Sequence, residues 1–313
     1  MSEKRAKGQY FTFKNPFNNQ AFKDWGEKCD IKNSKILEPF AGKNSLIEML
    51  EEMNLCQNFA AFDIEPKNQK VEIRDTLKNF PTGFKVCITN PPYLAQNSAK
   101  RQGLDFAECE FDDLYKFALK KCLENCPYVG AIIPASFLNA KIFRNRLSYY
   151  VLLNSKMFCD TQHPVCLALF EPKSSDVKIY GDEKFIGNLL DLEKKVPQKR
   201  IKSNLKFNDC AGNLGLFAID NTISASIRFC LGEEISANKV QNSSRSITRI
   251  SVDCSNLAKL IKNLNEYLAQ FRAETYDVFL TPFKGLRKDG LYRRRLDYGI
   301  ARSIINEVIC KIG

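Results

Sequence analysis

The first 171 residues alternate between short runs rich in β-branched and aromatic residues and longer runs with a helical apolar period. The strand-like runs are residues 35–40, 59–65, 71–75, 84–89, 128–133, 149–158 and 164–170. The helix-like runs are residues 16–28, 44–53, 111–126 and 135–148. Strands separated by such helices predict a doubly wound α/β fold, with a mostly parallel sheet covered on both faces. Only residues 159–163 separate the last two strands, which predicts an antiparallel terminal strand.

The character of the sequence changes after Phe170, where the polar, proline-containing stretch 171–176 predicts a domain boundary. We therefore expect one domain over residues 1–171 and a smaller α+β domain over residues 172–313. The elements expected in the second domain are an amphipathic helix over residues 256–274, a β-hairpin over residues 279–296 that turns at Asp289-Gly290, and a helix over residues 296–311.

The net charge of +11 is unevenly distributed between these two parts. Residues 1–171 hold 23 Lys and Arg against 20 Asp and Glu, which gives +3. Residues 172–313 hold 24 against 16, which gives +8. A basic half beside a nearly neutral half predicts a module that faces a polyanion, joined to a domain with another task.

Several classes of protein are disfavoured by what the sequence lacks. The longest nearly apolar stretch, residues 128–138, is far shorter than the roughly 20 residues that a membrane-spanning helix needs. The first five residues carry charges and no apolar run follows them, so we expect no secretion signal and a soluble, cytoplasmic protein. The twelve cysteines form no C-x-x-C pair and His163 is the single histidine, so we expect reduced cysteines and no metal site.

Polar and charged residues follow four consecutive strands at the point where each strand ends. These turns are Glu38–Leu46, Asp63–Glu65, Asp75–Leu77 and Asn90–Tyr93. In open α/β sheets, ligands bind beyond the carboxyl ends of the strands, so we expect one site here. Asp63 stands where an acid can accept hydrogen bonds from ribose hydroxyls. Gly42 has no G-x-G-x-x-G around it, which disfavours a nicotinamide cofactor.

The tetrapeptide Asn90-Pro91-Pro92-Tyr93 is the most specific of these turns. Two prolines fix the backbone and remove two donors, so their carbonyls act as pure acceptors. Asn90 adds a side-chain carbonyl, and Tyr93 adds an aromatic face. Such a group can hold a planar aromatic amine, because two acceptors receive hydrogen bonds from its N–H groups while the ring stacks. Hydrogen bonds donated by both N–H groups make the amine nitrogen more nucleophilic.

The order of these motifs resembles that of the S-adenosylmethionine-dependent DNA adenine-N6 methyltransferases, in particular their gamma group. The resemblance covers about residues 7–171. It is carried by Gly8–Thr12 as the N-terminal cofactor motif, Glu38–Gly42 as the first strand-end motif, Asp63 as the ribose-binding acid, Asp75 as the residue that binds the cofactor adenine, Asn90–Tyr93 as the catalytic tetrapeptide and residues 129–138 as a later core strand. One departure is Lys43-Asn44, which follows Gly42 where the family often has a second glycine.

The resemblance implies a Rossmann-like fold, S-adenosylmethionine as the cofactor and no metal. The implied cofactor-binding residues are Tyr10, Phe11, Thr12, Glu38, Pro39, Phe40, Gly42, Asp63, Ile64, Asp75, Thr76, Asn90 and Pro92. The implied catalytic residues are Asn90, Pro91, Pro92 and Tyr93, and Tyr93 is expected to stack on a flipped-out adenine. Phe158 is the expected stacking residue on the other face of the base, with His163 as the alternative. The adenine N6 is expected to attack the methyl group in line.

A cluster of basic residues in the second half suits phosphate contacts. Its members are Lys284, Arg287, Lys288, Arg293, Arg294, Arg295 and Arg302, interleaved with Phe283, Tyr292 and Tyr298. Attached to such a core, this cluster predicts a target-recognition domain for double-stranded DNA. We expect a site-specific enzyme of a bacterial restriction–modification system, active as a monomer, with a cognate restriction endonuclease as a possible partner.

Two alternatives remain open at this point. The same tetrapeptide occurs in enzymes that methylate a glutamine side chain of a protein, and related forms act on RNA. About 30 residues precede the first strand and about 140 follow the last, an arrangement that favours DNA over protein. The other alternative is a non-catalytic nucleic-acid-binding module with a degenerate methyltransferase core. The intact residues Asp63, Asp75 and Asn90 argue against it.

Overall fold

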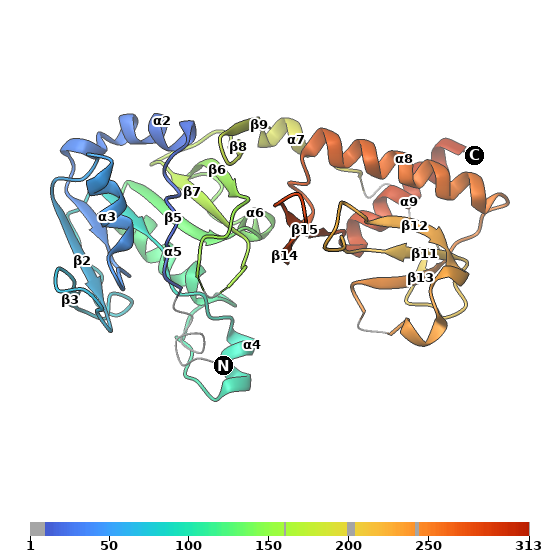
Figure 1. Ribbon diagram of the computed structural model, residues 1–313, viewed down its shortest axis with the longest axis horizontal. Coiled ribbons are helices and arrows are strands. Elements are labelled where there is room, and N and C mark those ends of the chain that lie inside the picture. Colours follow the sequence, from blue (N-terminus) through green and yellow to red (C-terminus); the bar gives the residue numbers. More distant parts are fainter. Residues whose placement is uncertain (1–9, 160, 199–203, 242–243, 313) are drawn as a thin grey trace. The chain divides into compact units, whose positions relative to one another are not determined.

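The computed structural model describes residues 10–159, 161–198, 204–241 and 244–312 (Figure 1). The chain forms two compact units, Met1–Asn188 and Leu189–Gly313. We predicted the boundary after residue 171, and this position is corrected to 188. The reason is that residues 178–188 form two further strands, which extend the sheet of the first unit.

One mixed sheet forms the centre of the first unit. Among the described residues it contains the strands β1 (Ile36–Glu38), β2 (Phe59–Asp63), β3 (Glu72–Ile73), β4 (Val86–Thr89), β5 (Tyr128–Pro134), β6 (Leu147–Leu153), β7 (Val165–Phe170), β8 (Lys178–Gly181) and β9 (Lys184–Asn188). Their order is β3-β2-β1-β4-β5-β7-β6-β8-β9. The strands β1 to β5 pair in parallel, whereas β7 lies antiparallel between β5 and β6. The predicted fold class, a mostly parallel sheet with an antiparallel strand, is confirmed. The antiparallel strand β7 lies within the sheet and not at its end, because β6, β8 and β9 continue the sheet beyond it.

Helices cover both faces of this sheet. The first unit contains α2 (Gln20–Cys29), α3 (Ser45–Glu52) and α5 (Leu114–Asn125), each close to a predicted helix. On one face, a Cβ atom placed on Gly130 would lie 2.8 Å from Ile88 Cδ1 and 3.6 Å from Cη2 of Trp25, which belongs to α2. On the opposite face, the thiol of Cys87, the neighbour of Ile88 in β4, lies close to the thiol of Cys122 of α5. Because neighbouring strand residues point to opposite faces, α2 and α5 sandwich the sheet.

The helix predicted over residues 135–148 is wrong. The structure has only the short helix α6 (Phe137–Ala140) there, and β6 begins at Leu147. Lys141 and Phe143 adopt left-handed backbone conformations, with φ of 57° and 54°, which end a right-handed helix. The guanidinium of Arg146 then donates to four backbone carbonyls of neighbouring segments and fixes this stretch in an irregular path.

The strand predicted over residues 149–158 is also partly wrong, because β6 ends at Leu153. The residues that follow continue without a regular partner until Phe158, which makes an isolated antiparallel bridge with Thr12. The link between β6 and β7 is therefore longer than predicted. A short helix, α4 (Gln96–Gln102), follows the tetrapeptide and was not predicted.

The second unit packs helices against an antiparallel sheet. Its described elements are α7 (Leu189–Glu193), β10 (Lys206–Phe207), β11 (Leu214–Phe217), β12 (Arg228–Leu231), the 3-10 turns η2 (Gly232–Glu234) and η3 (Ala237–Lys239), β13 (Ile247–Ser251), α8 (Leu257–Thr275), β14 (Thr281–Leu286), β15 (Tyr292–Arg295) and α9 (Tyr298–Ile312). The two long helices and the β14–β15 hairpin confirm the elements predicted there, whereas the sheet β10-β13-β11-β12 was not predicted.

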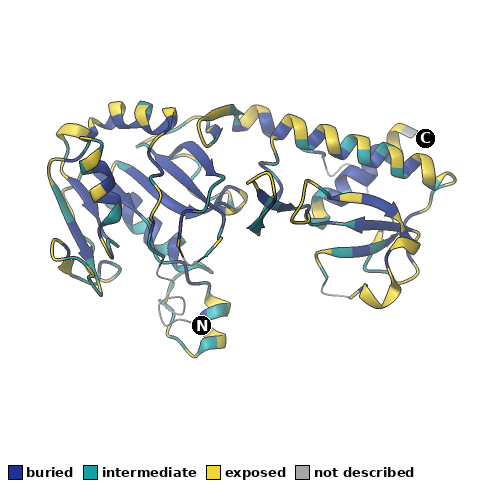
Figure 2. Ribbon diagram, in the orientation of Figure 1, coloured by how far each residue is buried: buried dark blue, intermediate teal, exposed yellow. Residues whose placement is uncertain are grey.

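The apolar face of α8 forms part of the core of the second unit. Leu260, Leu264, Leu268 and Phe271 are buried and pack with residues of the sheet and of α9. Figure 2 shows α8 alternating between exposed and buried residues, as its apolar period predicts. None of the described helices is long and apolar enough to span a membrane.

Candidate active site

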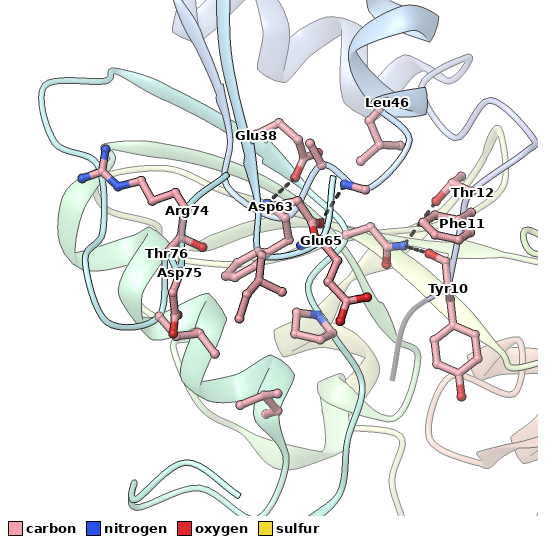
Figure 3. Close-up of a pocket in the computed structure, with 18 of the residues that line it drawn as sticks. Tyr10, Phe11, Thr12, Glu38, Leu46, Asp63, Glu65, Arg74, Asp75 and Thr76 are labelled. Atoms are coloured by element: carbon pink, nitrogen blue, oxygen red, sulfur yellow. Dashed lines mark hydrogen bonds between the residues drawn. The ribbon is translucent and has the colours of Figure 1, made fainter. Parts of the chain in front are cut away.

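A pocket of about 580 Å³ lies at the carboxyl ends of β1, β2 and β4 in the first unit (Figure 3). It is lined by most of the residues that the sequence predicted for cofactor binding: Tyr10, Phe11, Thr12, Glu38, Phe40, Gly42, Asp63, Ile64, Asp75, Thr76, Asn90 and Pro92. The exception among the described residues is Pro39, whose carbonyl accepts a hydrogen bond from the Thr76 hydroxyl. Gly8, at the start of the predicted N-terminal motif, lies outside the described residues.

The turn after β1 contains two residues in the left-handed backbone region. One of them, Gly42, has to be a glycine, whereas the other is Asn44. Gly42 has a φ of 53°, and a Cβ atom there would lie only 2.7 Å from Cε1 of the Phe11 ring. Asn44 has a φ of 67°, in the same left-handed region. Asparagine adopts this conformation more readily than most residues do. The departure from the family pattern at this position therefore leaves the backbone path intact.

Asp63 ties this turn to the end of β2. Its Oδ2 atom accepts a hydrogen bond of 2.8 Å from the Gly42 amide, and its Oδ1 atom accepts one of 2.8 Å from the Glu65 amide. The carboxylate therefore shapes the pocket before any ligand arrives. Glu65 also lines the pocket, and Figure 3 shows its carboxylate within the space between Asp63 and Tyr10.

Glu38 is a buried acid at the end of β1. Its Oε1 atom accepts hydrogen bonds from the Thr89 hydroxyl at 2.8 Å and from the Phe40 amide at 3.2 Å, and only 2% of the residue is exposed. Burial raises its pKa to about 8, with a smaller contribution from the charge of Asp63. Near neutral pH the side chain of Glu38 therefore holds its proton as long as no cationic ligand is bound beside it.

Asn90 is held in place through both ends of its side-chain amide. Its Nδ2 atom donates to the Tyr10 carbonyl at 2.6 Å, which fixes the side chain in one orientation. Its Oδ1 atom lies 2.7 Å from the Tyr93 hydroxyl, which donates to it or to the Ile132 carbonyl, also 2.7 Å away. Because the amide nitrogen is committed to the N-terminal segment, the oxygen is the group that remains to accept a hydrogen bond from a substrate amine.

Aromatic rings surround the tetrapeptide. The Tyr93 ring centroid lies 5.5 Å from that of Tyr10, 6.1 Å from that of Phe158 and 6.0 Å from that of His163. Both residues considered for the second stacking position therefore lie beside Tyr93. Phe158 has no exposed surface, and Tyr93 is 9% exposed.

Several pocket residues were not among the predicted cofactor-binding residues. Five of them lie in the strand-end turns where the site was expected, namely Ala41, Ser45, Leu46, Glu65 and Leu77, and three lie outside those turns, namely Arg74, Asp105 and Leu114. Arg74 follows β3 directly, so the rule that ligands bind at strand ends could have identified it as well. Asp105 stands in a stretch without apolar period, which gave no signal. Among the described residues, no group of three or more His, Cys, Asp or Glu side chains could hold a metal ion.

Two members of the predicted DNA-binding cluster in the second unit are buried, and their assignment is corrected. Arg287 is 8% exposed and Arg294 is 4% exposed. Arg287 forms ion pairs with Asp220 at 3.1 Å and with Asp289 at 2.7 Å, so its charge is used inside the unit. Of the remaining members, Lys284 and Lys288 are exposed, and Arg293, Arg295 and Arg302 are partly exposed.

The first unit is thus a mixed α/β unit with a largely parallel sheet and a ligand pocket at the carboxyl ends of its strands. Residues 10–158 match the family described as Eco57I restriction-modification methylase. The matched stretch is slightly less than half of the chain and contains every described residue that lines the strand-end pocket. The match supports a methyltransferase of a restriction–modification system. A comparison with curated proteins gave no match.

Solved structures resemble part of the chain at low sequence identity. A class I S-adenosylmethionine-dependent methyltransferase from Listeria monocytogenes is 13% identical, with 54% of this chain and 67% of that chain covered and a TM-score of 0.36. The methyltransferase subunit of a type I restriction–modification system from Streptococcus thermophilus is 14% identical, with 63% of this chain and 51% of that chain covered and a TM-score of 0.39. The DrdV–DNA complex is 14% identical, with 58% of this chain and 28% of that chain covered and a TM-score of 0.43. The chain thus spans about half of the type I subunit and less than a third of DrdV.

Proposed function

We propose that this protein transfers a methyl group from S-adenosylmethionine to N6 of an adenine in double-stranded DNA, as part of a restriction–modification system. The observation that carries this proposal is the position of Asn90. Its side-chain amide lies in the wall of the pocket that also contains Glu38, Asp63 and Asp75. An acceptor for an aromatic amine therefore stands beside groups suited to a nucleoside cofactor.

The residues of the pocket fit S-adenosylmethionine. Gly42 lines the pocket without a side chain, so the backbone can approach a ligand closely there. Asp63 and Asp75 can accept hydrogen bonds from ribose hydroxyls and from an adenine amine, and the exposed Ile64 offers an apolar surface to a ring. Glu38 can ionise beside a positive charge. When bound, S-adenosylmethionine supplies an electrophilic methyl group.

The tetrapeptide orients the substrate amine. An adenine inside a duplex is out of reach, so the base has to be flipped into the site. Asn90 Oδ1 and the Pro91 carbonyl each accept a hydrogen bond from one N–H group of the N6 amine. The bond to Asn90 Oδ1 replaces the one that the Tyr93 hydroxyl can donate to it. Tyr93 stacks on the base, with Phe158 or His163 opposite. Positioning of this kind supplies much of the acceleration in such reactions.

The second unit is proposed to recognise the target sequence. Its exposed lysines Lys284 and Lys288 and its partly exposed arginines, in particular Arg293, suit contacts with phosphates. A restriction endonuclease that cuts the same sequence is the proposed functional partner, since a methyltransferase of this class protects the sites that such a nuclease attacks.

The test is methyl transfer from labelled S-adenosylmethionine to unmethylated duplex DNA, followed by nucleoside analysis. We expect label in N6-methyladenine, and mapping of the labelled positions gives the recognition sequence. Label in RNA or in a protein instead would keep the methyl transfer and overturn the substrate. Tight DNA binding without any label would favour a non-catalytic module.

The Asn90→Ala variant tests the role of the tetrapeptide. Loss of one amine acceptor should lower turnover by about 100-fold or more, while the affinities for S-adenosylhomocysteine and for DNA change little. The matched control is Asn97→Ala, because Asn97 is an exposed asparagine of α4. Turnover of Asn90→Ala close to that of the wild-type protein would contradict the proposed mechanism.

A further inference from the structure

Three aromatic rings meet where the proposed function puts the target base. The Tyr10 ring centroid lies 5.5 Å from that of Tyr93 and 5.5 Å from that of Phe158. Tyr93 and Phe158 lie 6.1 Å apart, with their planes at 70° to each other. Tyr10 thus contacts both rings that are candidates to hold the base.

The two outer rings leave no room for a base between them. A base sandwiched between two rings needs them parallel and roughly 7 Å apart, because each stacked contact takes about 3.5 Å. The angle of 70° between Tyr93 and Phe158 excludes such a sandwich. Phe158 is fully buried and Tyr93 is nearly so, which means that other side chains cover the faces that a base would use.

Tyr10 connects this cluster to the pocket. Within the described chain, the residues that line the pocket include Tyr10 but neither Tyr93 nor Phe158. In Figure 3 the Tyr10 ring points away from Asp63 and Glu65. Tyr10 therefore stands between the open pocket and the two buried rings.

The segment that carries Tyr10 is attached on both sides of the site. The Tyr10 carbonyl accepts the hydrogen bond from Asn90 Nδ2, Thr12 bridges to Phe158, and the Phe13 amide donates to the Met157 carbonyl at 3.1 Å. These bonds hold the backbone of the segment against the tetrapeptide. The Tyr10 side chain can then leave its place by rotation, without loss of the bonds that orient Asn90.

We propose that Tyr10 occupies the place of the target base in the free protein and is displaced when the base enters. The inference rests on the proposed function, because it names the group that the flipped adenine replaces. Tyr10 is in this sense a positioning residue: it keeps Tyr93 and Phe158 packed until a planar base takes over its contacts.

The inference is tested by removing the Tyr10 ring and measuring whether free adenine binds in the cavity that this leaves. In Tyr10→Ala the ring is removed, and free adenine at millimolar concentration should bind in the space that remains, as small aromatic molecules do in cavities made by truncation. We expect a saturable rise in the melting temperature of the variant and an affinity for adenine on the order of tenfold above that of the wild-type protein. Tyr10→Leu, which keeps part of the volume, should give a smaller effect in the same direction.

Three controls show whether adenine occupies the proposed place. Purine, which lacks the exocyclic amine, should bind Tyr10→Ala more weakly than adenine does, because purine has no amine that can donate a hydrogen bond to Asn90. In Tyr10→Ala/Asn90→Ala this preference for adenine should disappear. Tyr180→Ala removes a buried ring of β8 near Tyr149 and should gain no affinity for adenine.

The outcomes separate the inference from the proposed function. If Tyr10→Ala and Tyr10→Leu bind adenine no better than the wild-type protein, or bind adenine and purine equally, the inference is wrong, even when the wild-type protein methylates DNA. If adenine binds as expected but DNA, RNA and protein receive no label, the place exists and the proposed enzymatic function fails. Tyr10→Phe should retain the closed site and the wild-type response to adenine.

Discussion

Three acidic side chains at the strand ends have different partners and therefore different tasks. Asp63 is engaged by two backbone amides and shapes the glycine turn. Glu65 directs its carboxylate into the pocket. Glu38 is buried, and its pKa of about 8 means that it changes charge within the physiological pH range. A cationic ligand can therefore reverse the protonation state of Glu38.

The pH dependence of stability tests the state of Glu38. Burial raises its pKa from 4.5 to about 8, so the folded protein binds this proton more tightly than the unfolded chain does. The resulting stabilisation is complete below pH 4.5 and is lost as the pH rises towards about 8. Glu38→Gln should keep it at all pH values and be more stable than the wild-type protein in mildly alkaline buffer, by about 1–3 kcal/mol.

Urea unfolding at several pH values measures this difference. Glu52→Gln, at an exposed position of α3, is the matched control and should follow the wild-type curve. Parallel curves for Glu38→Gln and the wild-type protein would mean that Glu38 is ionised in the folded state.

At the residue scale, the sequence predicted those side chains whose chemistry follows from their place at a strand end. Asn90 and Gly42 belong to this group. The sequence-based prediction failed for Arg287 and Arg294, because a run of basic residues does not show which of them lie buried within their own domain. The partner of Arg287 is Asp220, which lies 67 positions away in the sequence.

Among the elements, long amphipathic helices and buried strands were predictable, whereas glycine-dependent packing was not. The sheet of the second unit shows why. A Cβ atom on Gly232 would lie 2.1 Å from the Gly212 carbonyl oxygen, and one on Gly215 would lie 2.6 Å from Cys230 Sγ. The strands β11 and β12 and the turns beside them approach closely because these positions carry no side chain. A glycine adds nothing to the hydrophobic period of the sequence, so this packing could not be predicted.

The β14–β15 hairpin is the element that we expect to contact DNA through its exposed lysines. Lys284→Ala/Lys288→Ala should weaken binding to duplex DNA and reduce the slope of log K against log salt by about 2, since each phosphate contact contributes about 0.9. Lys259→Ala/Lys262→Ala, which removes two exposed lysines of α8, is the matched control. An equal loss of slope in both double variants would show a diffuse charge effect without a contact at the hairpin.

At the scale of the whole molecule, the chain divides into two compact units. In the second unit, Asp220 is a carboxylate without exposed surface that connects several segments. Its carboxylate forms ion pairs with Arg272 of α8 at 2.9 Å and with Arg287 at 3.1 Å, and it accepts backbone hydrogen bonds as well. Burial raises the pKa of Asp220, but the hydrogen bond and the charge of Arg272, together with the backbone hydrogen bonds from Ser226 and Ile227, lower it by more. The net pKa lies below its ordinary value, so the acid stays ionised.

Asp220→Ala should therefore destabilise the second unit by about 3 kcal/mol, because Arg287 and Arg272 each lose one of their two carboxylate partners, although Asp289 and Asp277 remain. The single tryptophan, Trp25, lies in the first unit and reports on that unit alone. We expect the circular dichroism of the variant to show an early transition, while the fluorescence transition of Trp25 stays at its wild-type denaturant concentration. Asp191→Ala, which breaks an exposed ion pair with Lys194, should leave both transitions close to their wild-type positions.

A coincident shift of both signals in Asp220→Ala would mean that the two units unfold as one cooperative block. An unchanged circular dichroism transition would mean that the buried charges relax without their partner.

The position of β7 has a consequence for synthesis of the chain on the ribosome. This strand lies between β5 and β6 but follows both in sequence. During translation, the edges of β5 and β6 stay open until residues 165–170 have left the exit tunnel. An open edge of buried, apolar strands is a template for aggregation, so the nascent chain passes through an interval in which these two edges are exposed to it. The stretch 10–158 ends within that interval, before β7 begins at Val165.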